Sequence, residues 1–196
     1  MTILGIAASP RRNGNSEILL DKVLEGASSK GARIEKVVLS NFSIRPCQGC
    51  SKCYKDAACV IRDGMQPLYR KLEKADAIVI SSPVYFGSIT AQLKAMIDRC
   101  QPIWVKNFFL KKPRKNRRLR KGIFISVSRF NRLRFFKNSQ EIIEILFMVI
   151  GVKLFRKLYV SDLENHGEVL KRGPVLEKAF RYGTELATNR RTDTCG

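Results

Sequence analysis

Hydrophobic and polar residues alternate along this chain in blocks that fit strands and helices in turn. Residues 2–8, TILGIAA, form a nearly continuous apolar run, which is typical of a strand covered on both faces in a parallel sheet. From Asn15 onward, apolar residues fall on one side of a helix that Gly31 can close: Ile18, Leu19, Val23, Leu24 and Ala27. Residues 2–31 are therefore predicted to form a strand, a polar loop and a helix.

The same alternation repeats along the rest of the chain. Further strands are predicted over residues 32–39, 76–86, 122–128 and 153–162. Further helices are predicted over residues 65–75, 89–100, 139–151 and 173–187. Five strands alternating with five helices predict an α/β protein with a doubly wound parallel sheet, and 196 residues suit a single domain. Ligands of such sheets bind beyond the carboxyl ends of the strands, so we expect the chemistry in the loops found there.

The loop after the first strand, SPRRNGNS, has the composition of an anion site. Free backbone N–H groups at a helix N-terminus bind anions. Short polar side chains and arginines surround that position: Ser9, Arg11, Arg12, Asn13, Asn15 and Ser16. The loop matches neither the triphosphate motif G-x-x-x-x-G-K-[ST] nor the dinucleotide motif G-x-G-x-x-G. It favours a phosphomonoester, and an ordinary polar strand-to-helix loop is the alternative.

The loop after the third strand, SSPVYFGS, suits a flat ligand. Pro83 fixes the backbone, Tyr85 and Phe86 offer aromatic faces, and Gly87 permits a close approach. An aromatic pair at a strand end also occurs in ordinary cores and interfaces. Taken with the anion loop, this stretch indicates a ligand that carries a phosphate at one end and a planar ring system at the other.

Four of the six cysteines follow the second strand in the run CQGCSKCYKDAAC, within the segment 45–63. The spacing is C-x2-C-x2-C-x5-C, and the four residues are Cys47, Cys50, Cys53 and Cys59. Tight cysteine runs ligate [4Fe–4S] clusters, whereas structural zinc more typically takes two separated pairs or adds histidines. The run favours a cluster, with zinc, a cluster-free thiol relay or a degenerate loop as alternatives. The remaining candidates are expected to be a core thiol, a tail thiol and a surface residue: Cys100, Cys195 and His166.

The two loops, with SSPVYFGS extended to SSPVYFGSITAQLKAMIDR, resemble the NAD(P)H-dependent FMN reductase family of flavodoxin-like proteins. With the cysteine run between them, the chain resembles more specifically the iron–sulfur flavoproteins of archaea and anaerobes. The resemblance implies a flavodoxin-like fold with strand order 2-1-3-4-5, noncovalently bound FMN, a [4Fe–4S] cluster and assembly into a homo-oligomer, either a dimer or a tetramer.

The resemblance also implies roles for individual residues. The FMN phosphate would bind Ser9, Arg11, Asn13, Asn15 and Ser16. The isoalloxazine ring would lie against Pro83, Val84, Tyr85, Phe86 and Gly87. Family members often carry a glycine-rich turn after the fourth strand, whereas this chain has no glycine from 123 to 150. Its candidate flavin contacts there are Ser126, Ser128 and Arg129.

The formal net charge of +20 predicts an acidic partner. Eight of the eleven residues in the segment 111–121 are Lys or Arg, and Arg45, Lys52, Lys55 and Arg62 flank the cysteines. An acidic redox protein such as ferredoxin fits both features. Nucleic acid and a merely solvated loop are the alternatives. The chain shows neither a secretory leader nor an apolar stretch of bilayer length, so we expect a cytoplasmic location without a membrane anchor.

The sequence therefore predicts an electron-transfer flavoprotein that passes electrons between a [4Fe–4S] cluster and FMN, fed by ferredoxin. The cofactors would supply the redox chemistry, and no side chain is needed as a nucleophile or general base. One alternative is an NAD(P)H-dependent FMN or quinone reductase without a functional cluster. The other is a redox-sensing module that binds nucleic acid through its basic segment.

Overall fold

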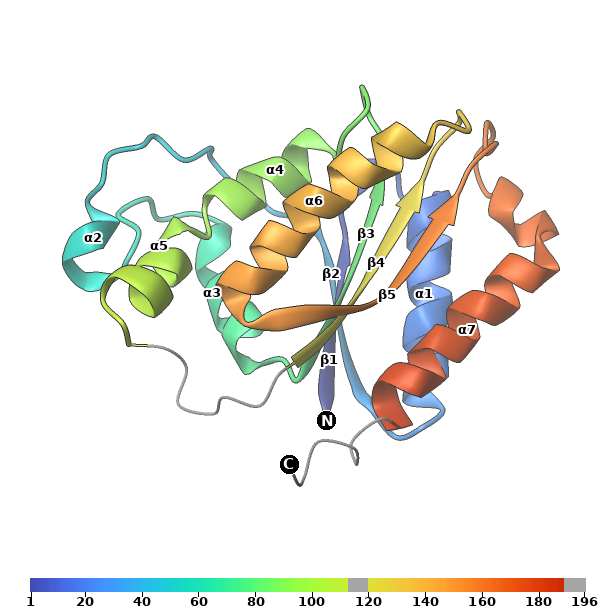
Figure 1. Ribbon diagram of the computed structural model, residues 1–196, viewed down its shortest axis with the longest axis horizontal. Helices are drawn as coiled ribbons and strands as arrows, with labels where there is room; N and C mark the ends of the chain where they lie inside the picture. Colours follow the sequence, from blue (N-terminus) through green and yellow to red (C-terminus); the bar gives the residue numbers. More distant parts are fainter. Residues whose placement is uncertain (113–119, 189–196) are drawn as a thin grey trace.

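In the computed structural model, which describes residues 1–112 and 120–188, one sheet of five parallel strands has the order β2-β1-β3-β4-β5 (Figure 1). The strands are β1 (Thr2–Ala7), β2 (Arg33–Val38), β3 (Ala77–Pro83), β4 (Arg120–Val127) and β5 (Val152–Val160). This confirms the predicted flavodoxin-like order and places the cysteine run after β2. Because β1 has β2 on one side and β3 on the other, the strand order reverses at β1.

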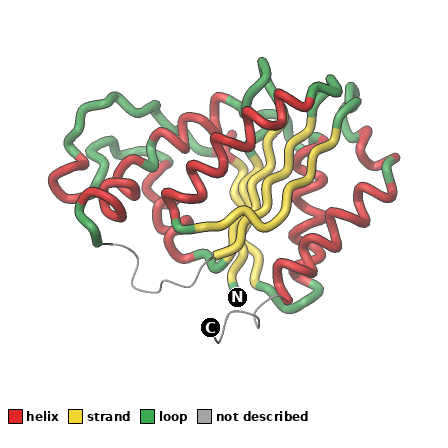
Figure 2. Tube along the Cα trace, viewed as in Figure 1, coloured by secondary structure: helices red, strands yellow, loops and turns green. Residues whose placement is uncertain are grey.

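Helices cover both faces of the sheet (Figures 1 and 2). On one face lie α1 (Asn15–Ser28) and α7 (Gly173–Thr188); on the other lie α3 (Met65–Lys74), α4 (Ala91–Asp98) and α6 (Leu133–Ile150). Alternate residues of β1 enter the two cores, with Ile3 on the α1 face and Leu4 on the α3 face. The central strands read as continuous apolar runs because both of their faces are buried.

The shorter elements lie outside the predicted pattern. They are η1 (Leu39–Asn41), α2 (Cys53–Asp56), α5 (Gln101–Trp104), the π-helix η2 (Val105–Phe109) and η3 (Glu168–Lys171). Helix α6 also begins at Leu133, six residues before the predicted start at 139, because Phe136 packs into the core from its first turns. None of the helices in the described part of the chain is long and apolar enough to cross a membrane.

Arg120, which the sequence places in the basic segment 111–121, is not a surface residue. Its side chain is buried, with 6% relative exposure, and β4 begins at this residue instead of at Gly122. The guanidinium donates hydrogen bonds to the carbonyls of Leu72 and Ala75 at the C-terminal end of α3, and to those of Ile150 and Gly151 at the C-terminal end of α6. Arg120 thus satisfies the terminal carbonyls of two helices. Residues 113–119 of that segment lie outside the described residues.

Helices α1 and α7 approach each other through two glycines. A Cβ atom on Gly183 would lie 1.9 Å from the carbonyl oxygen of Val23, and one on Gly26 would lie 2.0 Å from that of Phe180. Real Cβ atoms do not come so close to backbone oxygen. Glycine at both positions is therefore what lets these helices pack at this distance.

Candidate functional site

A cavity of about 270 Å³ lies at the carboxyl ends of the strands, between the loops that follow β1, β3, β4 and β5. Seven of the ten predicted flavin residues line it: Ser9, Arg11, Asn15, Ser16, Pro83, Val84 and Tyr85. Ser128 and Arg129 line it as well, whereas Ser126 is buried within β4. Asn13, Phe86 and Gly87 are not among the lining residues. The structure therefore brings the two predicted loops to one site, and the loops after β4 and β5 form the remaining wall.

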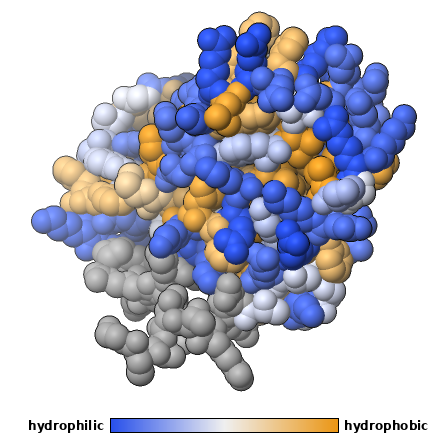
Figure 3. Space-filling model, turned by 45° about the vertical axis from the view of Figure 1, so that its right-hand side comes forward, coloured by the Kyte–Doolittle hydropathy of each residue, from blue (hydrophilic) through white to orange (hydrophobic). Residues whose placement is uncertain are grey.

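A tight turn explains why Phe86 lies outside this cavity. Tyr85 and Ser88 exchange backbone hydrogen bonds of 2.8 and 3.0 Å. The two residues between them, Phe86 and Gly87, have φ values of 48° and 76°. Two positive φ values are the signature of a type I′ turn, which leaves the Phe86 side chain fully exposed. Figure 3 shows apolar side chains reaching the surface at the upper end of the molecule, where the strands end.

A buried carboxylate that the sequence analysis did not single out shapes the anion loop. Glu17, with 1% exposure in the first turn of α1, accepts a 2.7 Å hydrogen bond from the backbone N–H of Asn13, whose φ is 53°. It also pairs with Arg12 at 3.2 Å and with Lys36 at 2.8 Å. Burial alone would raise the pKa of Glu17, but these bonds outweigh burial and hold its pKa below the ordinary value.

Asn15 joins the anion loop to the segment after β5. Its side-chain amide donates to the carbonyl of Asn165 at 2.8 Å and accepts from the N–H of Val169 at 3.0 Å. His166 Nε2 lies 2.8 Å from the carbonyl oxygen of Arg12 and lines the cavity, as an exposed residue. Both polar ends of the Asn15 amide are thus engaged within the protein. The residue positions a wall of the cavity.

The four predicted ligand cysteines share a second cavity, of about 590 Å³. All are free thiols; Cys47 and Cys50 are exposed, and Cys53 and Cys59 are half-buried. Burial raises the pKa of Cys53, and the nearby Cys59, Cys47 and Cys50 raise it further. No three His, Cys, Asp or Glu side chains of the described residues are gathered closely enough to hold a single metal ion. Four sulfur donors around one roomy cavity fit the ligand set of a four-thiolate cluster.

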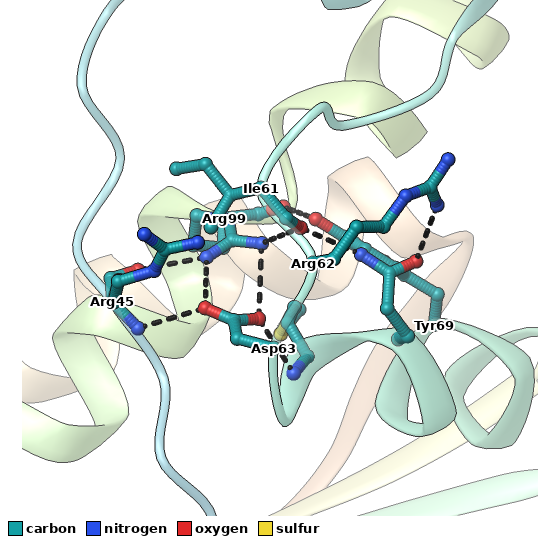
Figure 4. Close-up of polar contacts among 8 residues, drawn as sticks. Arg45, Ile61, Arg62, Asp63, Tyr69 and Arg99 are labelled. Carbon is teal, nitrogen blue, oxygen red and sulfur yellow. Dashed lines mark hydrogen bonds and ion pairs between the residues drawn. The ribbon is translucent and has the colours of Figure 1, made fainter.

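Arg99 holds both ends of the cysteine loop (Figure 4). It follows α4, is 1% exposed, and donates to the carbonyl of Arg45 before the loop at 2.8 Å and to that of Ile61 after it at 3.1 Å. The same guanidinium makes two bonds to the Asp63 carboxylate, at 2.8 and 3.2 Å. The hydroxyl of Tyr69 donates to the Arg99 carbonyl at 2.6 Å. The loop therefore leaves and re-enters the fold at one buried arginine.

Asp63 completes this arrangement from the other side of the loop. Its carboxylate accepts backbone N–H bonds from Arg45 at 2.9 Å and from Met65 at 3.0 Å. Burial would raise the pKa of Asp63, but the Arg99 guanidinium and these backbone donors bring its pKa below the ordinary value. The pair remains ionised at neutral pH, and hydrogen bonds engage both carboxylate oxygens and both terminal guanidinium nitrogens.

The charged residues that flank the cysteines in the sequence do not form the walls of the cavity that the cysteines share. Arg45, Lys52, Lys55 and Arg62 are exposed, and none of them lines the cysteine cavity. Arg99 is the one basic residue among its described lining residues, and it lies 40 positions beyond Cys59 in the sequence. No local sequence signal marks that arginine, because its partners come from a distant loop.

Cys100 is buried in the core, as predicted, although it also lines the cysteine cavity. Its thiol donates to the carbonyl of Met96 at 3.4 Å, and burial raises its pKa to about 12. A buried, protonated thiol is inert, so Cys100 differs in kind from the four cysteines of the loop. Cys195 lies outside the described residues.

Residues 1–150 match the model of a family described as NADPH-dependent FMN reductase. The chain belongs to this family. Among relatives of this FMN reductase family member, it is 41% identical over 111 residues to an iron-sulfur flavoprotein of Methanosarcina thermophila, a match covering 57% of this chain and 58% of that protein. It is 42% identical over 102 residues to an iron-sulfur flavoprotein of Archaeoglobus fulgidus, covering 52% and 46%. The chain thus spans about half the length of the curated relatives it matches.

The fold of this FMN reductase family member is similar to that of a solved structure over nearly the whole chain. The NAD(P)H:quinone oxidoreductase from Methanothermobacter marburgensis superposes with a TM-score of 0.74 at 18% identity, over 98% of each chain. At that identity the match establishes the shared flavodoxin-like fold and nothing about substrates.

Proposed function

We propose that this protein is an electron-transfer iron–sulfur flavoprotein, with FMN in the cavity at the strand ends and a [4Fe–4S] cluster on the cysteine loop. The observation that carries the proposal is the grouping of Cys47, Cys50, Cys53 and Cys59 around one cavity in a chain of FMN reductase fold. Relatives named iron-sulfur flavoprotein support the same pairing of cofactors.

The anion loop would hold the phosphate of FMN. The N-terminus of α1 offers free backbone N–H groups, and Ser9, Arg11 and Ser16 line the cavity beside it. Glu17 keeps that loop in shape through Asn13, and Asn15 closes one wall. Pro83, Val84 and Tyr85 border the position of the ring. FMN supplies chemistry in which one or two electrons are taken up at a time.

The cysteine loop would hold the cluster through four thiolates, at Cys47, Cys50, Cys53 and Cys59. Arg99 and Asp63 fix the two ends of that loop, so its sulfur donors start from a restricted set of positions. The cluster supplies single-electron transfer. No side chain of either site is required to act as a nucleophile or general base in this scheme.

The electron donor we propose is an acidic redox protein such as ferredoxin. The formal charge of +20 favours such a partner, and Lys52 and Lys55 are exposed on the loop that carries the cysteines. A homo-oligomer, dimer or tetramer, belongs to the same proposal. Phe86 and Phe130, which follow the lining residues Tyr85 and Arg129 in the sequence, are exposed aromatic residues of the kind that interfaces cover.

Anaerobic purification followed by iron, sulfide and flavin analysis tests the proposal. We expect about four irons and one FMN per chain, as a single [4Fe–4S] centre requires. Cys50→Ala is expected to abolish the cluster absorbance and keep the flavin. Cys100→Ala, which removes a buried thiol outside the loop, is expected to keep both. Wild-type protein that binds FMN but contains no iron would contradict the proposed [4Fe–4S] cluster.

The family description favours one second candidate, an NADPH-dependent FMN or quinone reductase in which the cysteines carry no functional cluster. Anaerobic NADPH oxidation distinguishes the two functions. Steady turnover that is equal in wild type and in Cys50→Ala would favour the reductase. Reduction of the flavin by a reduced ferredoxin in wild type, lost in Cys50→Ala, would favour the electron-transfer protein.

A further inference from the structure

We propose that Arg99 is the positioning residue of the cluster: it fixes both ends of the cysteine loop and donates its remaining N–H, on Nε, to a sulfur in the cysteine cavity. The inference rests on the proposed function, because it assumes that the loop binds a cluster. It assigns a role to a residue that lies outside the cysteine run and outside the flavin cavity.

The two terminal nitrogens of Arg99 are fully used. Nη1 donates to the carbonyl of Arg45 and to Asp63 Oδ2, both at 2.8 Å. Nη2 donates to the carbonyl of Ile61 at 3.1 Å and to Asp63 Oδ1 at 3.2 Å. These four bonds hold the guanidinium rigidly, since each terminal nitrogen has one loop carbonyl and one carboxylate oxygen (Figure 4).

The third nitrogen has no such partner. Arg99 Nε is buried, and no hydrogen-bond acceptor for it exists among the described residues. A buried donor without an acceptor costs about 1–3 kcal/mol, more when the group is charged, so it points to a ligand that completes it. Arg99 lines the cavity that the four cysteines share, and sulfur is the acceptor that distinguishes this cavity.

The chemistry of the cluster matches that donor. A centre bound by four thiolates carries negative charge, and negative charge near a buried surface needs compensating donors. Hydrogen bonds to cluster sulfurs stabilise the more negative, reduced state and thereby raise the reduction potential. The exposed lysines and arginines of the loop are screened by water, whereas the buried Arg99 is not.

The first experiment detects the hydrogen bond in the protein itself. The full chain is labelled with arginine carrying ¹⁵N at Nε, purified without oxygen and examined by pulsed EPR of the reduced cluster. We expect a hyperfine coupling to an arginine Nε in wild type, retained in Arg62→Lys and lost in Arg99→Lys. Arg62 is the matched control because it also flanks the loop but is exposed and bonded to Gln66. A cluster-loaded wild type without this coupling overturns the proposal, however the variants fold.

The second experiment measures the consequence. Arg99→Lys keeps the charge but removes Nε, so we expect a more negative midpoint potential and roughly 10-fold faster iron loss to a chelator than in Arg62→Lys. FMN content is expected to stay equal in both variants. If both variants bind iron and have equal midpoint potentials and equal rates of iron loss, the proposed role of Arg99 is contradicted and the proposed function is not. Wild-type protein without iron contradicts the proposed function instead.

Discussion

Glu17 shows how one buried carboxylate can shape a binding loop without touching a ligand. Its oxygens accept a hydrogen bond from the backbone N–H of Asn13 and form ion pairs with Arg12 and Lys36. Asn13 and Arg12 belong to the anion loop, and Lys36 belongs to β2. We expect Glu17→Gln to lower the free energy of unfolding by about 1.5–3 kcal/mol, the range for hydrogen bonds to charged groups. We also expect FMN affinity to fall, because glutamine leaves a single acceptor oxygen, for which the Asn13 N–H competes with Arg12 and Lys36.

Chemical denaturation and FMN titration check this prediction against Glu25→Gln. Glu25 lies on the same helix, is 56% exposed and pairs only with Lys22 among the described residues, at 2.7 Å. A change of less than about 0.5 kcal/mol is expected there. Equal effects of the two substitutions would show that Glu17 has no special part in the loop.

The pH dependence of stability follows from the same carboxylate. Its pKa is lower in the folded protein than its ordinary value of 4.5. Glu17 therefore stabilises the folded state above that ordinary value, and the contribution is lost as the pH falls through the lowered pKa. We expect the difference in unfolding free energy between wild type and Glu17→Gln to shrink at acidic pH. A difference that stays constant down to about pH 3 would contradict this origin.

The residues of the site divide by how local their signals are. The loop residues Ser9 and Tyr85 could be predicted because polar, aromatic and glycine residues at strand ends are a feature of the sequence itself. Glu17 had a partial signal: it stands three residues after the N-cap Gly14, the position of the glutamate in a capping box, although glycine lacks the Ser or Thr side chain of that motif. Arg99 had none, because its bonds cross 36 to 54 positions of the chain.

At the scale of elements, the central strands could be predicted from the sequence. Because β1, β3 and β4 are buried on both faces, each reads as a nearly continuous apolar run. The start of β4 was missed because Arg120 looks like part of a charged loop until the helix ends around it are known. The four-residue helices α2 and α5 are too short for any periodicity to emerge.

The contact between α1 and α7 yields a prediction for Gly183. Its missing side chain admits the carbonyl of Val23, which is backbone and cannot rotate away. We expect Gly183→Ala to lower the free energy of unfolding by about 1–3 kcal/mol or more, although alanine favours helices. Gly173→Ala is the matched control, since nothing lies within 4 Å of a Cβ at that end of α7. Thermal unfolding of the Gly183→Ala and Gly173→Ala variants tests this prediction. Equal melting temperatures would mean that α1 and α7 can move apart without loss of stability.

At the scale of the molecule, the two cavities lie near opposite ends of α6. Ser128 and Arg129, just before the helix, line the cavity at the strand ends, whereas Ile145 and Val149, in its last turns, line the cysteine cavity. A rise of about 1.5 Å per residue places Ile145 roughly 18 Å along the helix from Leu133. This separation is why we expect substitutions in the cysteine loop to leave flavin binding intact.

The charge of the whole molecule governs encounters with the proposed acidic donor. With a formal net charge of +20, association with ferredoxin should be steered electrostatically, and the rate of flavin reduction should fall roughly 10-fold or more as ionic strength rises from about 0.01 to about 0.15 M. Stopped-flow measurements with reduced ferredoxin check this, with a small uncharged reductant as the control. A rate that ignores salt would exclude electrostatic docking.

Charge reversal then locates the docking face. Lys52→Glu, beside the cysteines, and Lys30→Glu, after α1, change the net charge by the same amount at two exposed positions. If ferredoxin docks over the cysteine loop, Lys52→Glu slows reduction several-fold more than Lys30→Glu at low salt, and the difference vanishes at high salt. Equal slowing by both variants would mean that overall charge, and not a particular face, attracts the donor.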